Sequence, residues 1–150
     1  MALAWSSTEL PAMLKIAFAT ADRVRVDQHF GATEGFAVYA VDGERSRLVE
    51  VAEFGRESMD GNEDKLAAKI EALAGCAAVY CLAVGGSAVR QLMAAGVRPI
   101  RLEAETPIER LLAELQRAAR EGNVPWIEAA LRPGKDAARF DRIAEEGWHE

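Results

Sequence analysis

A change of hydrophobic period, in the middle third of the chain, is the feature of this sequence that most constrains its fold. Before the change, three short apolar runs follow one another, over residues 14–19, 35–41 and 46–54. Runs of this length are typical of strands, and Asp42-Gly43 between the second and the third is a dipeptide typical of hairpin turns. We therefore predict three consecutive antiparallel strands.

After the change, helical and strand periods alternate. The spacing of apolar residues predicts helices and strands in turn, over residues 60–75, 77–84, 85–96, 97–103 and 106–122. Strands that alternate with helices are expected to be parallel, with right-handed crossovers. The resulting order, β-β-β-α-β-α-β-α, predicts an α/β fold with a mixed five-stranded sheet and helices on its faces. This is the arrangement of ribonuclease-H-like folds.

Local signals refine these elements. Thr106 and Glu109 form a capping box, with Pro107 at the first helical position, so the last long helix is expected to begin there. Ser87 is a candidate N-cap for the preceding helix. Pro99 favours an edge position for the last strand, because it has no amide hydrogen to donate.

The domain organisation follows from these elements. A chain of 150 residues is long enough for one domain with a real core. We expect a flexible extension over residues 1–13, a single domain over residues 14–122, and a C-terminal segment over residues 123–150. That last segment contains one possible short helix, at residues 125–132, followed by a charged tail.

Composition and charge exclude several classes of function. The formal net charge is −6 and no basic stripe is present, which argues against a nucleic-acid partner. No apolar run approaches the ~18 residues of a membrane span. The first residues lack the basic and apolar regions of a signal peptide. The expected location is therefore the cytoplasm, without a membrane partner.

The two cysteines, Cys76 and Cys81, lie at the ends of one apolar stretch. If both belong to a strand, their odd spacing places them on opposite faces, ~16 Å apart. They are then too far apart for a disulfide or for one shared metal ion. The alternative for each is a small buried core residue.

A turn made of Gly85, Gly86 and Ser87 joins the predicted strand at 77–84 to the next helix. It is not a nucleophile elbow, because Val89 stands where that motif requires glycine. It also lacks the lysine and the spacing of a phosphate-binding loop. What remains is a helix N-terminus with little side chain around its backbone amides, which favours anions. A simple tight turn is the alternative interpretation.

A metal-dependent nuclease is suggested by the fold alone. Ribonuclease-H-like nucleases hold divalent ions with carboxylates, one of them on the first strand. The strand at residues 14–19 has no acidic residue, and Asp22, Asp27 and Glu34 lie in the loop that follows. Nuclease activity is therefore supported only by analogy of fold.

His29, one of two histidines, lies in the same polar loop. Together with Asp27 it cannot form a zinc site, which needs three or four protein ligands. It either hydrogen-bonds Asp27 as an ordinary loop residue, or anchors a preassembled iron–sulfur cluster that brings its own sulfide bridges. Such clusters are usually anionic, so Arg23 and Arg25, with Arg90 as a further candidate, would complement the charge.

Three stretches, residues 15–42, 61–103 and 138–148, together closely resemble the dinitrogenase iron–molybdenum cofactor family of nitrogenase cofactor-biosynthesis proteins. The resemblance implies a ribonuclease-H-like core without nuclease activity. It implies binding of the iron–molybdenum cofactor or its iron–sulfur precursor, and transfer between assembly proteins, namely a precursor-producing enzyme and a cofactor scaffold. His29 matches the cluster-anchoring histidine of the family, and Cys81 is a second candidate ligand.

We therefore expect a non-catalytic carrier of an anionic iron–sulfur precursor. His29, Arg23 and Arg25 would share one edge of the sheet with the turn at residues 85–87, if the strands at residues 14–19 and 77–84 are parallel neighbours. Two alternatives remain: a regulatory or interaction module of the same fold without a cluster, and a metal-dependent nuclease.

Overall fold

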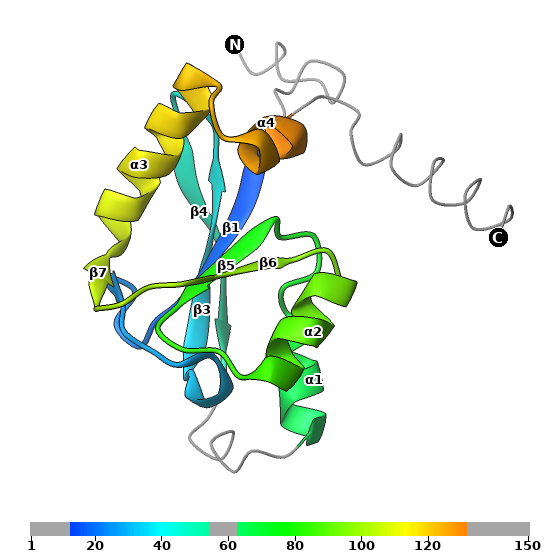
Figure 1. Ribbon diagram of the computed structural model, residues 1–150. Coiled ribbons are helices and arrows are strands. Elements are labelled where there is room, and N and C mark those ends of the chain that lie inside the picture. The colour runs from blue at the N-terminus through cyan, green and yellow to red at the C-terminus, as the bar shows by residue number, and fades with distance from the viewer. Residues whose placement is uncertain (1–12, 55–62, 132–150) are drawn as a thin grey trace, which may run out of the picture.

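The computed structural model describes residues 13–54 and 63–131 and contains a mixed five-stranded sheet (Figure 1). The strands lie in the order β4-β3-β1-β5-β6. They are β1 (Leu14–Ala19), β3 (Gly35–Val41), β4 (Ser46–Glu53), β5 (Ala78–Cys81) and β6 (Arg98–Arg101). The tail predicted beyond residue 131 lies outside the described residues, as does all of the predicted extension except Met13.

The N-terminal half of the sheet is antiparallel, as predicted. β1 and β3 have the predicted bounds and pair from Leu14 opposite Val41 to the other end of β1. Asp42 closes the hairpin to β4, because its Oδ1 accepts hydrogen bonds from the amides of Glu44 (2.8 Å) and Arg45 (2.7 Å). The turn predicted from Asp42 and Gly43 is therefore confirmed.

β4 is irregular where its apolar alternation is imperfect. Val38 pairs with Glu50, but the next residue of β3, Tyr39, pairs with Leu48. Val49 is thus an extra residue in β4, which is the definition of a β-bulge. A bulge shifts the alternation of side chains by one residue, and this explains why the sequence does not read as a clean half-exposed strand.

The C-terminal half of the sheet is parallel, again as predicted. β5 lies between β1 and β6 and pairs in parallel with both, so β6 forms the edge that Pro99 favours. The helices are α1 (Glu63–Glu71), α2 (Gly86–Ala94), α3 (Ile108–Glu121) and α4 (Pro125–Leu131). Gly122 ends α3 in the left-handed region at φ 67°, which a glycine adopts without steric cost.

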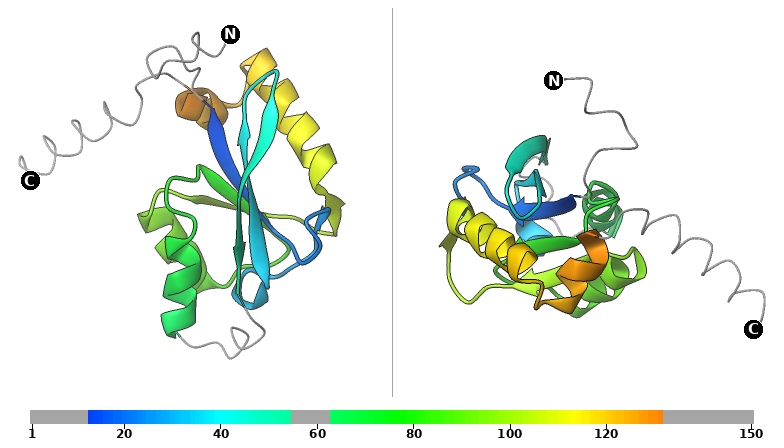
Figure 2. Two further views of the ribbon diagram at one scale, coloured as in Figure 1. Left: turned by 180° about the vertical axis from the view of Figure 1, so that it is seen from behind. Right: turned by 90° about the horizontal axis from the view of Figure 1, so that it is seen from above.

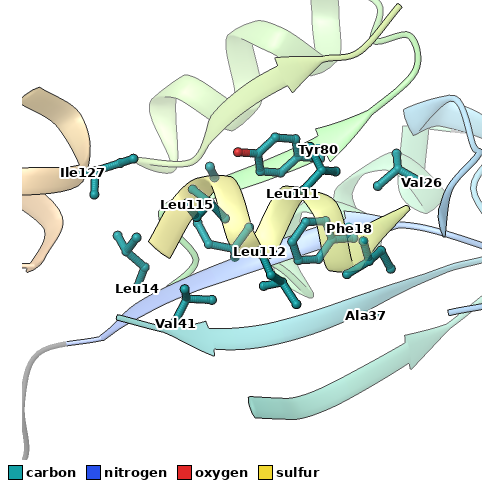
Figure 3. Close-up of a cluster of buried hydrophobic side chains, with 13 residues drawn as sticks. Leu14, Phe18, Val26, Ala37, Val41, Tyr80, Leu111, Leu112, Leu115 and Ile127 are labelled. Carbon is teal, nitrogen blue, oxygen red and sulfur yellow. The ribbon is translucent and has the colours of Figure 1, made fainter. Parts of the chain in front are cut away.

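Helices cover both faces of the sheet and enclose two cores (Figures 1 and 2). Leu14, Ile16 and Phe18 point from β1 towards α3 and α4, into what we call the first core. Figure 3 shows Leu111, Leu112 and Leu115 of α3 beside Phe18 and Val41 in this core. The alternate β1 residues, Ala17 and Ala19, belong to the second core, on the side of α1 and α2. The members of the second core are Ala17, Ala19, Phe30, Phe36, Val38, Leu73, Cys76, Val79, Cys81, Ala88, Leu92 and Val97.

The start of α3 differs from the prediction. The helix begins at Ile108, and Thr106–Pro107 instead form a short strand, β7, that pairs with β2 (Arg25–Val26). The hydroxyl of Thr106 donates to the carbonyl oxygen of Ala104 (2.9 Å), and the amide of Ile108 donates to Val24 (2.9 Å). The predicted capping box is therefore wrong, because pairing with a distant part of the chain takes up the residues that would have formed it.

The start of α2 also differs by two residues. Gly85 occupies the N-cap position, and Ser87 lies inside the first turn of the helix. The hydroxyl oxygen of Ser87 accepts a hydrogen bond from Nε2 of Gln91 at 3.1 Å, one helical turn later. Ser87 is therefore not the N-cap, although the turn itself lies where the sequence predicts it.

Candidate functional site

The loop after β1 and the turn after β5 meet at one edge of the sheet. β1 and β5 are parallel neighbours, so their carboxyl ends lie side by side. The amide of Phe30 donates to the carbonyl oxygen of Ala83 (2.7 Å), and the amide of Leu82 donates to that of Gln28 (2.9 Å). His29 therefore lies between two residues that are bonded to the segment leading into Gly85. Open α/β sheets usually bind their ligands at such an edge.

Buried anchors shape the loop around His29. Phe30 is fully buried in the second core, and its ring centroid lies 5.6 Å from that of Phe36. Phe30–Ala32 form a short 3₁₀ helix, η2, and Thr33 is also fully buried. The hydroxyl of Thr33 donates to the carbonyl oxygen of Gly35 at 2.7 Å. These anchors on the C-terminal side of His29 fix the direction in which the chain leaves it.

The side chain of His29 is exposed, and its backbone is extended (φ −77°, ψ 147°). No hydrogen bond joins its imidazole to any other residue in the described ranges. Asp27, the expected partner of an ordinary loop histidine, instead accepts a hydrogen bond from the amide of Ala21 at 3.2 Å. Gly31 leaves open space nearby, since nothing lies within 4 Å of a Cβ atom placed there. The imidazole is thus available to an external ligand.

Arg23 and Arg25 face carboxylates. The guanidinium of Arg23 lies 2.6 Å from Oε2 of Glu53, on β4. That of Arg25 lies 3.8 Å from Asp22 and 3.6 Å from Glu105. Both arginines are in the loop that also carries His29, but their charges are already partly neutralised. Their predicted role as the positive complement of an anion is therefore less well supported than their positions suggest.

The turn before α2 has an open backbone and a nearby cation. Nothing lies within 4 Å of a Cβ atom placed on Gly85. For Gly86 the nearest atom is Nη1 of Arg90, at 3.7 Å. Gly85, Gly86 and Ser87 are exposed, as is Arg90. Arg90 has no ion pair within the described parts of the chain, so its charge is available at this turn.

The aspartates of the loop accept hydrogen bonds from backbone amides of the same loop. Asp22 accepts hydrogen bonds from the amides of Val24 (2.8 Å) and Arg25 (3.1 Å), which hold the pKa of its carboxyl below the usual value. Within residues 13–54 and 63–131, no three His, Cys, Asp or Glu side chains lie close enough to hold a metal ion together. The described residues thus offer a single imidazole rather than a complete set of protein ligands.

Comparison with known proteins decides the family. The sequence profile described as "Dinitrogenase iron-molybdenum cofactor" matches residues 13–118. The chain belongs to this family. It is 54% identical over 140 residues to the protein NifX of Azotobacter vinelandii, covering 92% of this chain and 89% of that protein. It is 39% identical over 140 residues to NifX of Klebsiella pneumoniae, covering 91% and 85%. The resemblance inferred from the three sequence stretches is confirmed.

A longer relative contains a similar region. The FeMo cofactor biosynthesis protein NifB of Azotobacter vinelandii is 32% identical over 125 residues, which are 80% of this chain but 25% of NifB. Among solved structures, that of PH0822 superposes with a TM-score of 0.56 at 21% identity, covering 70% of this chain and 90% of that one. A putative dinitrogenase of Methanocaldococcus jannaschii superposes with a TM-score of 0.52 at 10% identity, covering 72% and 91%. At these identities the likeness shows the fold alone.

Cys81 does not reach the surface of this family member. Its side chain and that of Cys76 both lie in the second core, with exposures of 0% and 4%. The expectation that they occupy opposite faces is wrong, because Cys76 precedes β5 and so does not share its alternation. Burial raises the pKa of each thiol to about 11, which disfavours the thiolate that binds metal. Both residues fit the alternative interpretation as small core residues.

In the described ranges no helix combines the length and the apolar character needed to cross a membrane.

Lys69 is the residue of this region that sequence reasoning missed. It lies on α1, is only 1% exposed, and donates from Nζ to the carbonyl oxygen of Gly31 in η2 at 2.6 Å. The available signal was its spacing: Lys69 falls on the same helical face as Leu66 and Leu73, where an amphipathic helix is otherwise apolar.

Proposed function

We propose that this protein is a non-catalytic carrier in the biosynthesis of the nitrogenase iron–molybdenum cofactor. It binds an iron–sulfur precursor of that cofactor, or the cofactor itself, through His29, and transfers it between assembly proteins in the cytoplasm. The observation that carries the proposal is the exposed imidazole of His29, held at the carboxyl edge of the sheet beside an open helix N-terminus. Family membership and the names of NifX and NifB support the pathway.

One protein ligand suits this cargo. The irons of a preassembled cluster are already bridged by sulfide, so a single imidazole can complete an open coordination position. A single ligand suits transfer better than a site closed by four cysteines, because fewer bonds between protein and iron have to break on release. We therefore assign His29 as the protein ligand and treat Cys81 as a core residue, because its thiol is buried.

The turn before α2 would supply the complement to a negative charge. The first amides of α2 have no partner within the helix, and such amides attract anions. Gly85 and Gly86 leave them uncovered, and Arg90 adds a guanidinium at the same place. We assign this role to Arg90 and the amides around Ser87 in preference to Arg23 and Arg25, which already face carboxylates.

The strand order supports assignment to the ribonuclease-H-like folds. The short β2 is not part of the five-stranded sheet. If the five strands of that sheet are numbered 1 to 5 along the chain, their order across the sheet is 3-2-1-4-5. β1 is Leu14–Ala19 and contains no acidic residue. Asp22 and Asp27 accept hydrogen bonds from backbone amides of their own loop. These observations favour a carrier over a nuclease. We take the partners of this carrier, a precursor-producing enzyme and a cofactor scaffold, to be other proteins of the same pathway.

Anaerobic loading tests the assignment. The purified chain is mixed with isolated iron–molybdenum cofactor, and the iron that stays with the protein is measured after gel filtration. His29→Ala should lose at least about tenfold in retained iron and should unfold as the wild type does, since exposed loop substitutions typically change stability by under ~0.5 kcal/mol. His149→Ala, at the other histidine of the chain, is the matched control. Equal retention by all three proteins would eliminate His29 as the ligand, and no retained iron in any of the three would favour a cluster-free interaction module.

A further inference from the structure

Lys69 is a buried cation on an otherwise apolar helix face. It is 1% exposed, on the side of α1 that also carries Leu66 and Ile70 towards the second core. Burying an ammonium group costs free energy unless the surroundings compensate it with good hydrogen bonds. A helix that needed only to cover the sheet would have an apolar residue at this position. Unlike an apolar side chain, the ammonium group of Lys69 can donate hydrogen bonds to the groups around it.

The compensation includes the loop that carries His29. Nζ of Lys69 donates to the carbonyl oxygen of Gly31 at 2.6 Å, a short distance typical of charge-assisted hydrogen bonds. The same Nζ lies 5.8 Å from the ring centroid of Phe54, at the end of the chain segment that contains β4. Gly31 is the middle residue of η2, and His29 is the residue that immediately precedes this short helix.

The 3₁₀ helix η2 is thus held from two sides. On one side the amide of Phe30 bonds to Ala83, after β5. On the other side α1 reaches η2 through Lys69. A single turn of 3₁₀ helix has little stability of its own, so its orientation depends on such contacts. The exposed His29 next to it has no side-chain bond to fix its position within the described residues.

We infer that Lys69 is a positioning residue for the His29 site. The inference rests on the proposed function, because it takes His29 to be the ligand. By fixing the carbonyl of Gly31, Lys69 orders η2 before the cluster binds, and the cluster then does not have to supply that ordering from its own binding energy. A site whose supporting contacts are loosened binds more weakly even when its ligand is intact.

Lys69→Met separates this role from simple core packing. Methionine has a similar length and apolar bulk but no donor for Gly31. Two measurements are compared: amide hydrogen exchange of Phe30, Ala32 and Thr33 in the protein alone, and iron retained after anaerobic loading with isolated iron–molybdenum cofactor. The control is Ile127→Ala, which removes a buried side chain of the first core, on the other face of the sheet.

We expect Lys69→Met to speed exchange of these three amides at least about tenfold and to lower retained iron several-fold at a temperature well below unfolding. Ile127→Ala should lower thermal stability and leave both measurements unchanged. Unchanged exchange in Lys69→Met would overturn the inference. So would unchanged retention in Lys69→Met while His29→Ala loses iron, and in that case the proposed function would stand.

A wild-type level of retained iron in His29→Ala would instead reject His29 as the ligand, and the positioning role with it. If Lys69→Met does not fold, Lys69→Gln removes the charge and shortens the side chain while keeping it polar. The same loss of protection and of iron is expected for Lys69→Gln, and wild-type values for both would equally overturn the inference.

Discussion

The amide nitrogen of Phe30 lies 2.7 Å from the carbonyl oxygen of Ala83, and this hydrogen bond joins the loop after β1 to the turn after β5. The two segments are more than fifty residues apart in sequence, yet the bond places them side by side. His29 therefore shares an edge with the start of α2 because β1 and β5 are adjacent and parallel. The bond would lose its geometry if the side chain of Phe30 no longer filled the second core.

Replacing Phe30 should affect stability and binding together. Phe30→Ala leaves a cavity in the second core, and such substitutions typically cost about 3–5 kcal/mol of unfolding free energy. Urea denaturation measures the loss, and anaerobic loading with isolated iron–molybdenum cofactor measures the binding. Phe30→Leu should cost less and retain more iron. A loss below about 1 kcal/mol for Phe30→Ala would show that this ring does not anchor the loop.

Retention of the cofactor should depend more on the positive charge of Arg90, at the turn before α2, than on that of Arg25, in the loop after β1. Arg90→Glu and Gly86→Asp should each weaken cofactor retention several-fold, by on the order of 1 kcal/mol, and the effect should shrink as ionic strength rises. Arg25→Glu should have a smaller effect, because Arg25 already faces Asp22 and Glu105.

The control for net charge is Arg117→Glu, at an exposed position on α3. Retention is compared at low and high salt for all four variants. A larger loss for Arg25→Glu than for Arg90→Glu would place the anion against the loop rather than at the turn.

The buried thiols should make the fold sensitive to alkali. Burial raises the pKa of Cys76 and of Cys81 from 9.0 to about 11. Between these values an unfolded chain loses the thiol protons while the folded chain keeps them, so the folded state is favoured less as pH rises. The contribution of each protonated thiol to the free energy of unfolding, up to ~2 kcal/mol, is fully present below pH 9. It is lost as pH rises to about 11.

Urea denaturation between pH 8 and pH 11 measures this loss. Cys81→Ala removes one ionisable group, so its stability should fall less steeply with pH than that of the wild type, from a lower starting value. The native thiols should also react slowly with iodoacetamide at pH 8 and rapidly in urea. Fast alkylation of Cys81 in the folded protein would contradict its burial and would reopen its assignment as a ligand.

Several features were predictable because they depend on residues close together in sequence. The bounds of β1 and β3 follow from apolar runs flanked by polar residues, and the hairpin after β3 follows from Asp42 and Gly43. The parallel pairing of β1 with β5 follows from the alternation of strands and helices. That pairing predicts that His29 and the Gly85-Gly86 turn lie at one edge of the sheet.

The capping box at Thr106 and Glu109 was wrong for the opposite reason. The local pattern is a good helix start, but β7 pairs with β2, about eighty residues earlier in the chain, and this takes Thr106 out of the helix. The cysteines were placed on opposite faces because the alternation of the strand was extended to Cys76, which precedes β5 (Ala78–Cys81). Side chains alternate between the two faces only within the extended strand, so the spacing of Cys76 from Cys81 does not decide the face of Cys76.

The sequence by itself determined the order and type of the main elements, the family, and His29 as the candidate ligand, since these depend on local periods and matched stretches. Only the tertiary structure decided which charges are available there. Arg23 pairs with Glu53, thirty residues away, and Lys69 donates to Gly31, thirty-eight residues away. Such contacts depend on how separate elements pack against one another, because side chains so far apart in sequence meet only after the sheet and its helices have assembled.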